Sequence, residues 1–300
     1  MKNFTFIQKF QVPEVAYHLI DKMFTEEEIR FVSKMEKDIF TEDDIKKMDL
    51  VNVKHFIKNS YHRGIISIVD NIKGSFKISN FYGRLDIYAI SEMDKYKSFS
   101  RHDRDALDDW YFEAYYNGLG LKSDIPPSED EIMPLGQALS FIDQQDRPVY
   151  LNYCDCRSLR GECGFPTKTC ITYRNGINSF AHRGLSEEID KEKAKEIVKR
   201  ADKIGLMHTV NPNGICNCCG DCCYLFRGQI KRKSKGVWPK TTHIIDFDAS
   251  LCIACGKCVN KCHFDVFQKE GNILIDIEKC VGCGICVQSC PTKALKLIEK

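Results

Sequence analysis

Residues 14–60 repeat apolar positions with the period of an α-helix, separated by polar residues. Two helix starts are marked there by a threonine that precedes acidic residues, at Thr25 and at Thr41. A hydroxyl residue before an acidic first turn is typical of a helix N-terminus, because its side chain caps backbone N–H groups. A third periodic stretch begins at Val53 and continues to Tyr61. The sequence therefore predicts three helices in this segment.

Short strands are predicted after these helices. Ile66, Ile68 and Ile78 are apolar positions in two short segments, and residues 81–90 alternate as a strand does. Three helices followed by a two-stranded wing are the pattern of a winged helix–turn–helix domain. We expect such a domain over residues 1–122.

Basic residues are in excess over part of this expected domain. Residues 46–84 contain eight Lys or Arg residues, against only Asp49 and Asp70. A recognition helix and wing that contact DNA need such an excess. Winged helices also dock proteins, however, and the front of the same domain is strongly acidic. We therefore favour partner docking over DNA binding.

The apolar pattern predicts further elements along the chain. A helix is expected over residues 101–121, followed by a linker in which Pro126 and Pro127 prevent a helix. A short strand is expected at residues 149–151. Residues 186–206 predict a long helix that Gly205 ends.

Composition narrows the class of protein. The chain has 300 residues, a net charge of +2 and 43% hydrophobic residues, which suits two or three compact units. It has no run of about 18 apolar residues and no signal-peptide pattern in its first residues, so we expect no membrane span. Its 17 cysteines then indicate a cytoplasmic protein that binds metal rather than forming disulfides. No GxGxxG or Walker motif supports a bound nucleotide.

Two copies of one cysteine spacing lie close to the C-terminus. The first run contains Cys252, Cys255, Cys258 and Cys262, and the second contains Cys280, Cys283, Cys286 and Cys290, followed by Pro291. Zinc sites usually combine two CxxC pairs, and cysteines this dense cannot pair as disulfides without strain. The spacing suits cubane [4Fe–4S] clusters, each of which needs four thiolates.

This doubled pattern resembles the bacterial-type dicluster ferredoxins over about residues 243–300. In that family the fourth cysteine of each run serves the other cluster. The resemblance implies one cluster held by Cys252, Cys255, Cys258 and Cys290, and a second held by Cys280, Cys283, Cys286 and Cys262. One departure is His263, which follows the first run where the family usually has proline.

Nine further cysteines lie in the middle of the chain. They are Cys154, Cys156, Cys163 and Cys170 before the predicted long helix, and Cys216, Cys218, Cys219, Cys222 and Cys223 after it. Buried free thiols are one interpretation, because cysteine packs as a small apolar residue. Five cysteines in eight residues are hard to explain in that way. Thiolate-rich loops of this kind favour iron–sulfur clusters or zinc.

Two ligand schemes are open for these middle cysteines. Each of the two segments could bind its own [4Fe–4S] cluster, or the segments could interleave. Adjacent residues point in different directions, so Cys218 and Cys219 are not expected on the same cubane, and neither are Cys222 and Cys223. A cysteine beyond fourfold ligation would be a reactive thiol. Asp221 is a candidate oxygen ligand at a labile iron.

Residues 130–300 resemble a family of multi-cluster ferredoxin-like proteins of anaerobic bacteria and archaea. The resemblance rests on Cys154-Asp-Cys156-Arg157, on the segment from Cys216 to Gly220, and on the two terminal runs. Family members often have another cysteine where this chain has Asp221. The resemblance implies an α+β chain with a winged-helix-like domain at 1–122, a cysteine-rich cluster-binding domain at 123–242 and a ferredoxin domain at 243–300.

The main hypothesis is a cytoplasmic, low-potential electron-transfer protein. It would carry two ferredoxin-type [4Fe–4S] clusters and one or two more in the middle domain, and would donate electrons to a partner redox enzyme. We expect a component of this kind rather than a stand-alone reductase. One alternative is an oxidoreductase whose middle cluster has an open iron site for substrate. Another is a redox-sensing regulator that binds DNA through the winged helix.

Overall fold

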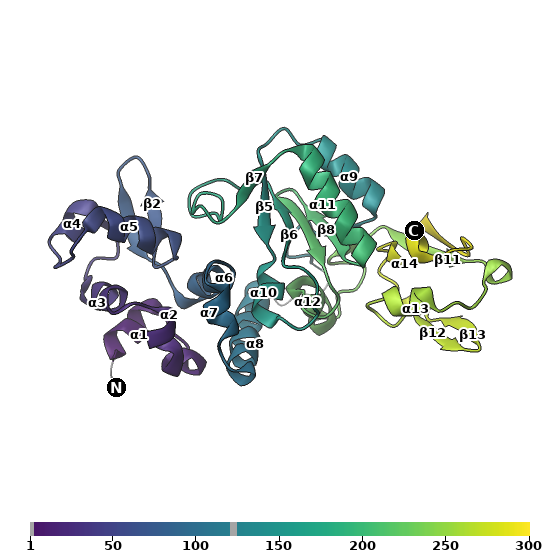
Figure 1. Cartoon of the computed structure of the whole chain (residues 1–300), viewed down its shortest axis with the longest axis horizontal. Helices are drawn as coiled ribbons and strands as arrows, with labels where there is room; N and C mark the ends of the chain where they lie inside the picture. The colour runs from purple at the N-terminus through teal and green to yellow at the C-terminus, as the bar shows by residue number, and fades with distance from the viewer. Residues whose placement is uncertain (1–2, 121–124) are drawn as a thin grey trace. The chain divides into compact units, whose positions relative to one another are not determined.

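The structure of the chain is a computed structural model that describes residues 3–120 and 125–300. The backbone divides into two compact units (Figure 1). The N-terminal unit comprises Met1–Tyr115, Ser158–Arg160 and Arg174–Glu187. The cysteine unit comprises Tyr116–Arg157, Gly161–Tyr173 and Glu188–Lys300, and it contains all 17 cysteines.

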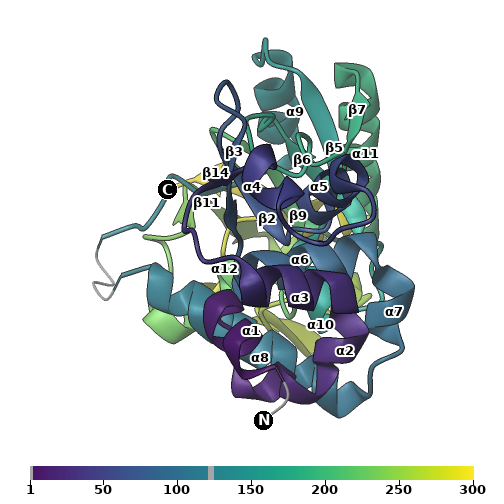
Figure 2. The ribbon, with the colours of Figure 1, turned by 90° about the vertical axis from the view of Figure 1, so that its left-hand side faces the viewer.

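The N-terminal unit consists of helices and one small antiparallel sheet. The strands β1 (Phe40–Thr41), β2 (Ile66–Asp70) and β3 (Ser75–Ile78) pair in the order β1-β3-β2. Figure 2 shows α4 and α5 next to one another beside β2. The helical elements are α1 (Phe4–Phe10), η1 (Glu14–Leu19), α2 (Ile20–Met23), α3 (Glu26–Lys34), α4 (Glu42–Lys46), α5 (Val53–His62), α6 (Phe81–Ser91), α7 (Met93–Lys97) and α8 (Arg101–Gly118).

Local chemistry explains where α3 begins. The backbone N–H of Glu28 donates to the Thr25 hydroxyl at 3.1 Å, and the Thr25 N–H donates to the Glu28 carboxylate at 2.8 Å. This capping box satisfies two N–H groups that the helix itself leaves without partners. The predicted helices after Thr25, after Thr41 and from Val53 are confirmed as α3, α4 and α5. The strands predicted around residues 66–68 and 78 are confirmed as β2 and β3.

The strand predicted over residues 81–90 is wrong, because this segment forms α6. The Asn80 side chain accepts a hydrogen bond from the Gly83 N–H at 2.9 Å and so caps the helix. Most of its following residues are buried, Leu85 and Tyr88 among them. A helix that is buried on most sides lacks the polar face that a helical period requires, so its apolar run resembles a strand.

A seven-stranded sheet forms the centre of the cysteine unit, in the order β10-β4-β8-β9-β6-β5-β7. Helices α9 and α11 cover one face of it (Figure 1). The strands are β4 (Glu131–Met133), β5 (Val149–Tyr153), β6 (Lys168–Thr172), β7 (Glu187–Ile189), β8 (Met207–Asn211), β9 (Gly214–Cys218) and β10 (Lys240–Thr241). The helices are α9 (Leu135–Asp143), α10 (Asp155–Arg160), α11 (Lys191–Ile204) and α12 (Tyr224–Arg232).

The long helix predicted over residues 186–206 is correct at its end and wrong at its start. Gly205, with a φ of 106°, ends α11 in the left-handed conformation that glycine adopts readily. The helix begins only at Lys191, where the Asp190 side chain accepts a hydrogen bond from the Lys193 N–H at 2.7 Å. The residues just before it belong to β7.

The two faces of the sheet differ in chemistry. Successive residues of a strand point to opposite faces. Ile171 and Ile215 pack in the apolar core under α9 and α11, so their neighbours Cys170 and Cys216 point to the other face. Ile171 of β6 pairs with Ile215 of β9, which places Cys170 beside Cys216 on adjacent strands.

The C-terminal segment belongs to the same unit as this sheet. Ile132, Met207 and Phe226 share one apolar core with Val281 and Ile285. All of residues 243–300 and most of the predicted domain at 123–242 thus lie in one unit, whereas Ser158–Arg160 and Arg174–Glu187 lie in the N-terminal unit. In this segment β11 (His243–Phe247) pairs with β14 (Leu295–Glu299), and β12 (Phe267–Glu270) pairs with β13 (Asn272–Ile275). Its helices are η2 (Ala249–Leu251), α13 (Lys257–Lys261), η3 (Ile277–Lys279) and α14 (Ile285–Ser289).

The mixture of helices and strands agrees with the predicted α+β class. Among the residues that the structure describes, no helix has the length and apolar character needed to cross a membrane.

Gly214 lies where β9 approaches β6 closely, because an added Cβ would be 2.3 Å from the carbonyl oxygen of Ile171. We predict that Gly214→Ala lowers the free energy of unfolding by about 1–3 kcal/mol. The pairing that places Cys170 beside Cys216 must shift to accept the methyl group. Denaturant unfolding of the metal-loaded protein under anaerobic conditions measures the change.

Gly136→Ala is the matched control for this substitution. Gly136 lies in α9 with no heavy atom within 4 Å of the Cβ position. Alanine has the higher helix propensity, so this variant should keep its stability or gain up to about 1 kcal/mol. An equal loss of stability in both variants would contradict the close-approach argument.

Candidate metal centres

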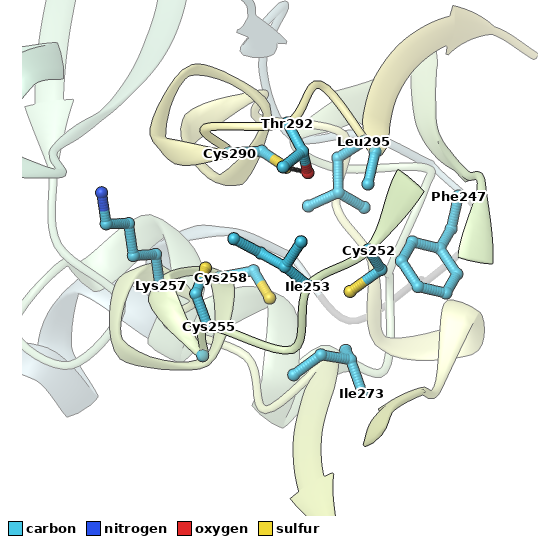
Figure 3. A pocket seen from close by; sticks show the side chains of 12 residues that line it. Phe247, Cys252, Ile253, Cys255, Lys257, Cys258, Ile273, Cys290, Thr292 and Leu295 are labelled. Atoms are coloured by element: carbon cyan, nitrogen blue, oxygen red, sulfur yellow. Dashed lines mark hydrogen bonds between the residues drawn. The ribbon is translucent and has the colours of Figure 1, made fainter. Parts of the chain in front are cut away.

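The first terminal run and the last cysteine of the second run surround one pocket. Cys252, Cys255, Cys258 and Cys290 line it (Figure 3). Apolar side chains, including Phe247, Ile273 and Leu295, form much of the remaining wall. Four thiols from two distant runs, in apolar surroundings, are a donor set that could hold one [4Fe–4S] cluster.

The other four cysteines of the terminal runs also lie near one another. Cys262 interacts electrostatically with Cys280, Cys283 and Cys286. Burial, and then the neighbouring Cys262 and Cys280 thiols, raise the pKa of Cys283 to about 12. A thiol whose pKa is raised in this way loses its proton at neutral pH only when a cation takes its place, and bound iron would supply that charge.

The two runs repeat the same backbone conformation. Ala254 and Gly282 occupy equivalent positions with φ of 51° and 69°. The N–H of Ala254 donates to the Cys252 sulfur and that of Gly282 to the Cys280 sulfur, each at 3.4 Å. Such hydrogen bonds to sulfur stabilise a thiolate and tune the potential of a cluster that it binds. At Gly282 a Cβ would lie 2.1 Å from the His243 carbonyl oxygen.

Six of the nine middle cysteines form a closed ring. Each thiol hydrogen-bonds to the next in the order Cys154, Cys156, Cys223, Cys218, Cys216, Cys170 and back to Cys154. The sulfurs of Cys218 and Cys223 are 3.3 Å apart. We call these residues the six-thiol ring. It provides more thiols than the four that one cubane needs.

The other three middle cysteines form a separate group, which we call the three-thiol set. Cys163, Cys219 and Cys222 interact with one another, and the Asp221 carboxylate joins them. The donor atoms of these four residues all lie within 4.8 Å of one another. The set is therefore compact, with three sulfurs and one oxygen.

The adjacent cysteine pairs divide between these two groups. Cys218 belongs to the ring and Cys219 to the three-thiol set, while Cys223 belongs to the ring and Cys222 to the set. Segments far apart in the sequence contribute to both groups, which is the interleaving that the sequence left open.

Secondary structure positions the ring. Cys170 and Cys216 come from adjacent strands, and the Thr209 hydroxyl on β8 lies 3.2 Å from the Cys218 sulfur. Cys154 precedes the first residue of α10, and Cys223 precedes the first residue of α12. Hydrogen bonds from Cys156 and Cys218 lower the pKa of Cys223, and the partial positive charge at the N-terminus of α12 acts in the same direction.

Arg157 lies between the ring and the three-thiol set. Its side chain is 2% exposed and donates hydrogen bonds to the carbonyl oxygens of Pro166 and Asn217 and to the Thr169 hydroxyl. Burial opposes its charge, but the thiolates of Cys154 and Cys219 help to raise its pKa above the usual guanidinium value. Arg157 thus supplies a buried positive charge to both groups.

Sequence patterns did not identify the polar residues behind the ring. His208 is fully buried, and its Nδ1 lies 2.6 Å from the Asn217 Oδ1. Asn217 in turn donates to the Thr169 carbonyl oxygen at 2.5 Å, and Asp202 lies 3.5 Å from His208 Nε2. This network fixes β9 next to Arg157. No local motif marks these residues, because their partners are distant in the chain.

Lys261 and His263, which flank Cys262, contact the end of α11 and the loop of the three-thiol set. The His263 ring donates to the Gly205 carbonyl oxygen at 2.8 Å, and the Lys261 ammonium donates to the Ile204 carbonyl oxygen at 3.3 Å. A Cβ on Gly220 would lie 2.4 Å from the His263 Cβ. Glycine is therefore required next to Cys219 for this close approach. His263, the departure from the ferredoxin pattern, takes part in it.

Comparison with known proteins supports part of this picture. The chain matches the model of the 4Fe-4S binding domain over residues 273–296, which include the cysteines of the second terminal run. A search of curated proteins found no match, and a search of solved structures also found none. The chain thus carries a 4Fe–4S binding domain, and with its many cysteines it is an iron–sulfur protein.

Crossed ligation in the terminal module can be tested by cysteine labelling. We predict that Cys290→Ala exposes the thiols of Cys252, Cys255 and Cys258 to alkylation, because they lose the cluster that they would share with Cys290. Mass spectrometry of the alkylated anaerobic protein identifies the labelled residues. The cysteines of the second run should stay protected.

Cys262→Ala provides the reciprocal control. This variant should expose Cys280, Cys283 and Cys286 and leave the first run protected. If each substitution instead exposes the cysteines of its own run, crossed ligation is wrong.

Proposed function

We propose that the chain is a multi-cluster electron-transfer protein that donates electrons to a partner redox enzyme. Two [4Fe–4S] clusters are held by the terminal runs, and one or two further iron–sulfur clusters are held by the middle cysteines. The observation that carries the proposal is the grouping of all 17 cysteines into four neighbouring sets within one compact unit.

Apolar packing between the sets supports this proposal. Cys258 and Cys286, one from each terminal run, contact the same apolar core. Cys283 contacts another core together with Cys216 and Cys223 of the six-thiol ring. Electron transfer needs short distances between redox centres. Sets that contact a common core satisfy this requirement without an intervening layer of water.

Particular residues of the chain have defined roles in the proposed electron transfer. A bound cluster accepts and releases one electron at a time. The cysteine thiolates hold it, and backbone N–H groups such as that of Gly282 stabilise the charge on sulfur. Arg157 offsets the added negative charge at the middle centre. Apolar residues such as Ile273 exclude water from the first terminal pocket.

Electrons enter or leave at the first terminal set in this account. Cys255 is exposed to solvent, as are the neighbouring apolar side chains of Leu251 and Ile253. Exposed apolar residues beside a redox centre suit brief contact with a partner protein. The N-terminal unit, with helices α3 to α5 and the hairpin of β2 and β3, is assigned to partner docking through its winged-helix-like part.

Iron and sulfide analysis tests the proposed function. Protein purified without oxygen should contain about twelve irons per chain or more, with an equal amount of acid-labile sulfide. Electron paramagnetic resonance (EPR) of the reduced protein should show signals beyond those of two interacting ferredoxin clusters. About eight irons would mean that the middle cysteines hold no cluster, and the extended chain of centres would be wrong.

A triple substitution within the ring provides the control. Replacing Cys154, Cys170 and Cys216 by alanine removes three neighbouring thiols of the ring and no cysteine of the terminal runs, and it leaves one thiol fewer than a cubane needs. It should lower the iron content by about four per chain and leave the ferredoxin signals in place. Unchanged iron content in this variant would contradict a ring-bound cluster.

A further inference from the structure

We propose that the three-thiol set and Asp221 bind a single divalent metal ion, separate from any iron–sulfur cluster. The ligands are the sulfurs of Cys163, Cys219 and Cys222 and one Asp221 carboxylate oxygen. The ion is Zn²⁺ or Fe²⁺, because thiolate-rich sites select these metals. This inference rests on the proposed function in one respect: it assigns the middle cluster to the six-thiol ring.

The spacing of the donor atoms supports one ion. A tetrahedral ion with metal–sulfur bonds of about 2.3 Å holds its sulfur ligands about 3.8 Å apart. The four donors here all lie within 4.8 Å of one another. The thiolates of a cubane bind four different irons at its corners, so they are not all mutually close in the way that ligands of one ion are, even where two of them approach as Cys218 and Cys223 do.

The terminal runs provide an internal standard for this argument. Their cysteines have the spacing of cubane ligands in the sequence. Across residues 3–120 and 125–300, no three cysteines of the terminal runs lie as close together as the three-thiol set does. Among the described residues the same donor spacing also occurs at Cys154, Asp155 and Cys156, but that group has only two thiols, whereas Cys163, Cys219 and Cys222 provide three.

The sequence around the set is also typical of a mononuclear site. Cys219-Gly-Asp-Cys222 is a CxxC pair, and Cys163 completes three thiols from a second loop. CxxC pairs are common in tetrahedral zinc sites. The Asp221 Oδ1 accepts the Cys222 backbone N–H at 2.9 Å, which holds the carboxylate next to the thiols.

The site has one buried side and one open side. Cys219 and Cys222 are buried and pack with Ala201 and Leu206, whereas Asp221 is exposed. A carboxylate at the exposed position is the ligand that water or a small monodentate ligand can replace. Three firm ligands with one exchangeable position are the arrangement of a catalytic rather than a structural metal.

The environment links this ion to the redox centres. Cys219 is bonded through the backbone to Cys218 of the ring, and Arg157 hydrogen-bonds to Cys219. Gly220 contacts His263, which follows Cys262 of the terminal module. The ion therefore lies beside two electron-carrying sets, with its exchangeable position facing solvent.

Metal analysis of the full-length protein tests the inference. Protein with intact clusters should contain about one metal ion per chain without matching acid-labile sulfide. Cys163→Ser should lose this ion. Asp221→Asn should retain it and release it to a chelator at least about tenfold faster, because a weaker ligand replaces the carboxylate. Glu162→Gln, next to Cys163, is the control and should behave like the unaltered protein.

Cobalt substitution gives a second readout. Co²⁺ bound to the otherwise cluster-loaded protein should show thiolate-to-cobalt charge-transfer and tetrahedral ligand-field bands. These bands should be absent in Cys163→Ser and shifted in Asp221→Asn. Failure of cobalt to bind, or extra iron with equal sulfide that Cys163→Ser removes, would overturn the single-ion site.

Measurements on the same samples distinguish a failure of the single-ion inference from a failure of the proposed function. If the sulfide count and EPR show the ring cluster but the extra metal is absent, the inference is wrong and the proposed function stands. If the extra metal is present but acid-labile sulfide amounts to only about eight per chain, the single-ion site stands and the extended chain of centres is wrong.

Discussion

Mutual repulsion of buried thiolates is the constraint on which the rest of the cysteine unit depends. Nine middle cysteines lie in two adjoining groups, and several of them are fully buried. A buried anion is costly unless a cation pairs with it. Bound metal and the Arg157 guanidinium would supply the positive charge that offsets these thiolates. Metal binding and folding are therefore expected to depend on each other in this unit.

The two faces of the seven-stranded sheet have different roles under this constraint. One face packs against α9 and α11 and forms an ordinary apolar core. The other presents Cys170 and Cys216 from neighbouring strands, so that regular strand geometry fixes part of the ring. The loop after β9 then divides its adjacent cysteines between the ring and the three-thiol set. One short segment thus contributes to both groups of thiols, and Gly220 brings it into contact with the terminal module.

The sequence pattern predicted those helix starts and ends that depend only on neighbouring residues. The cap at Thr25 and the end of α11 at Gly205 were predictable because they need only a few neighbouring residues. The 4Fe–4S binding domain matched over residues 273–296 was equally predictable, since the four cysteines of the second terminal run lie within one short segment. The partition of the middle cysteines was not predictable, because the tertiary fold brings Cys154 next to Cys170 and Cys156 next to Cys223 from distant segments. Helix α6 was missed because burial removed its polar face.

In the proposed arrangement, the six-thiol ring holds an iron–sulfur cluster beside those of the terminal module. Diffraction from crystals of the anaerobic, metal-loaded protein, recorded on both sides of the iron absorption edge, would locate the iron. We expect strong iron density inside the ring, in addition to density at both terminal sets. Iron density at the terminal sets alone, with the ring thiols in direct contact with one another, would contradict it.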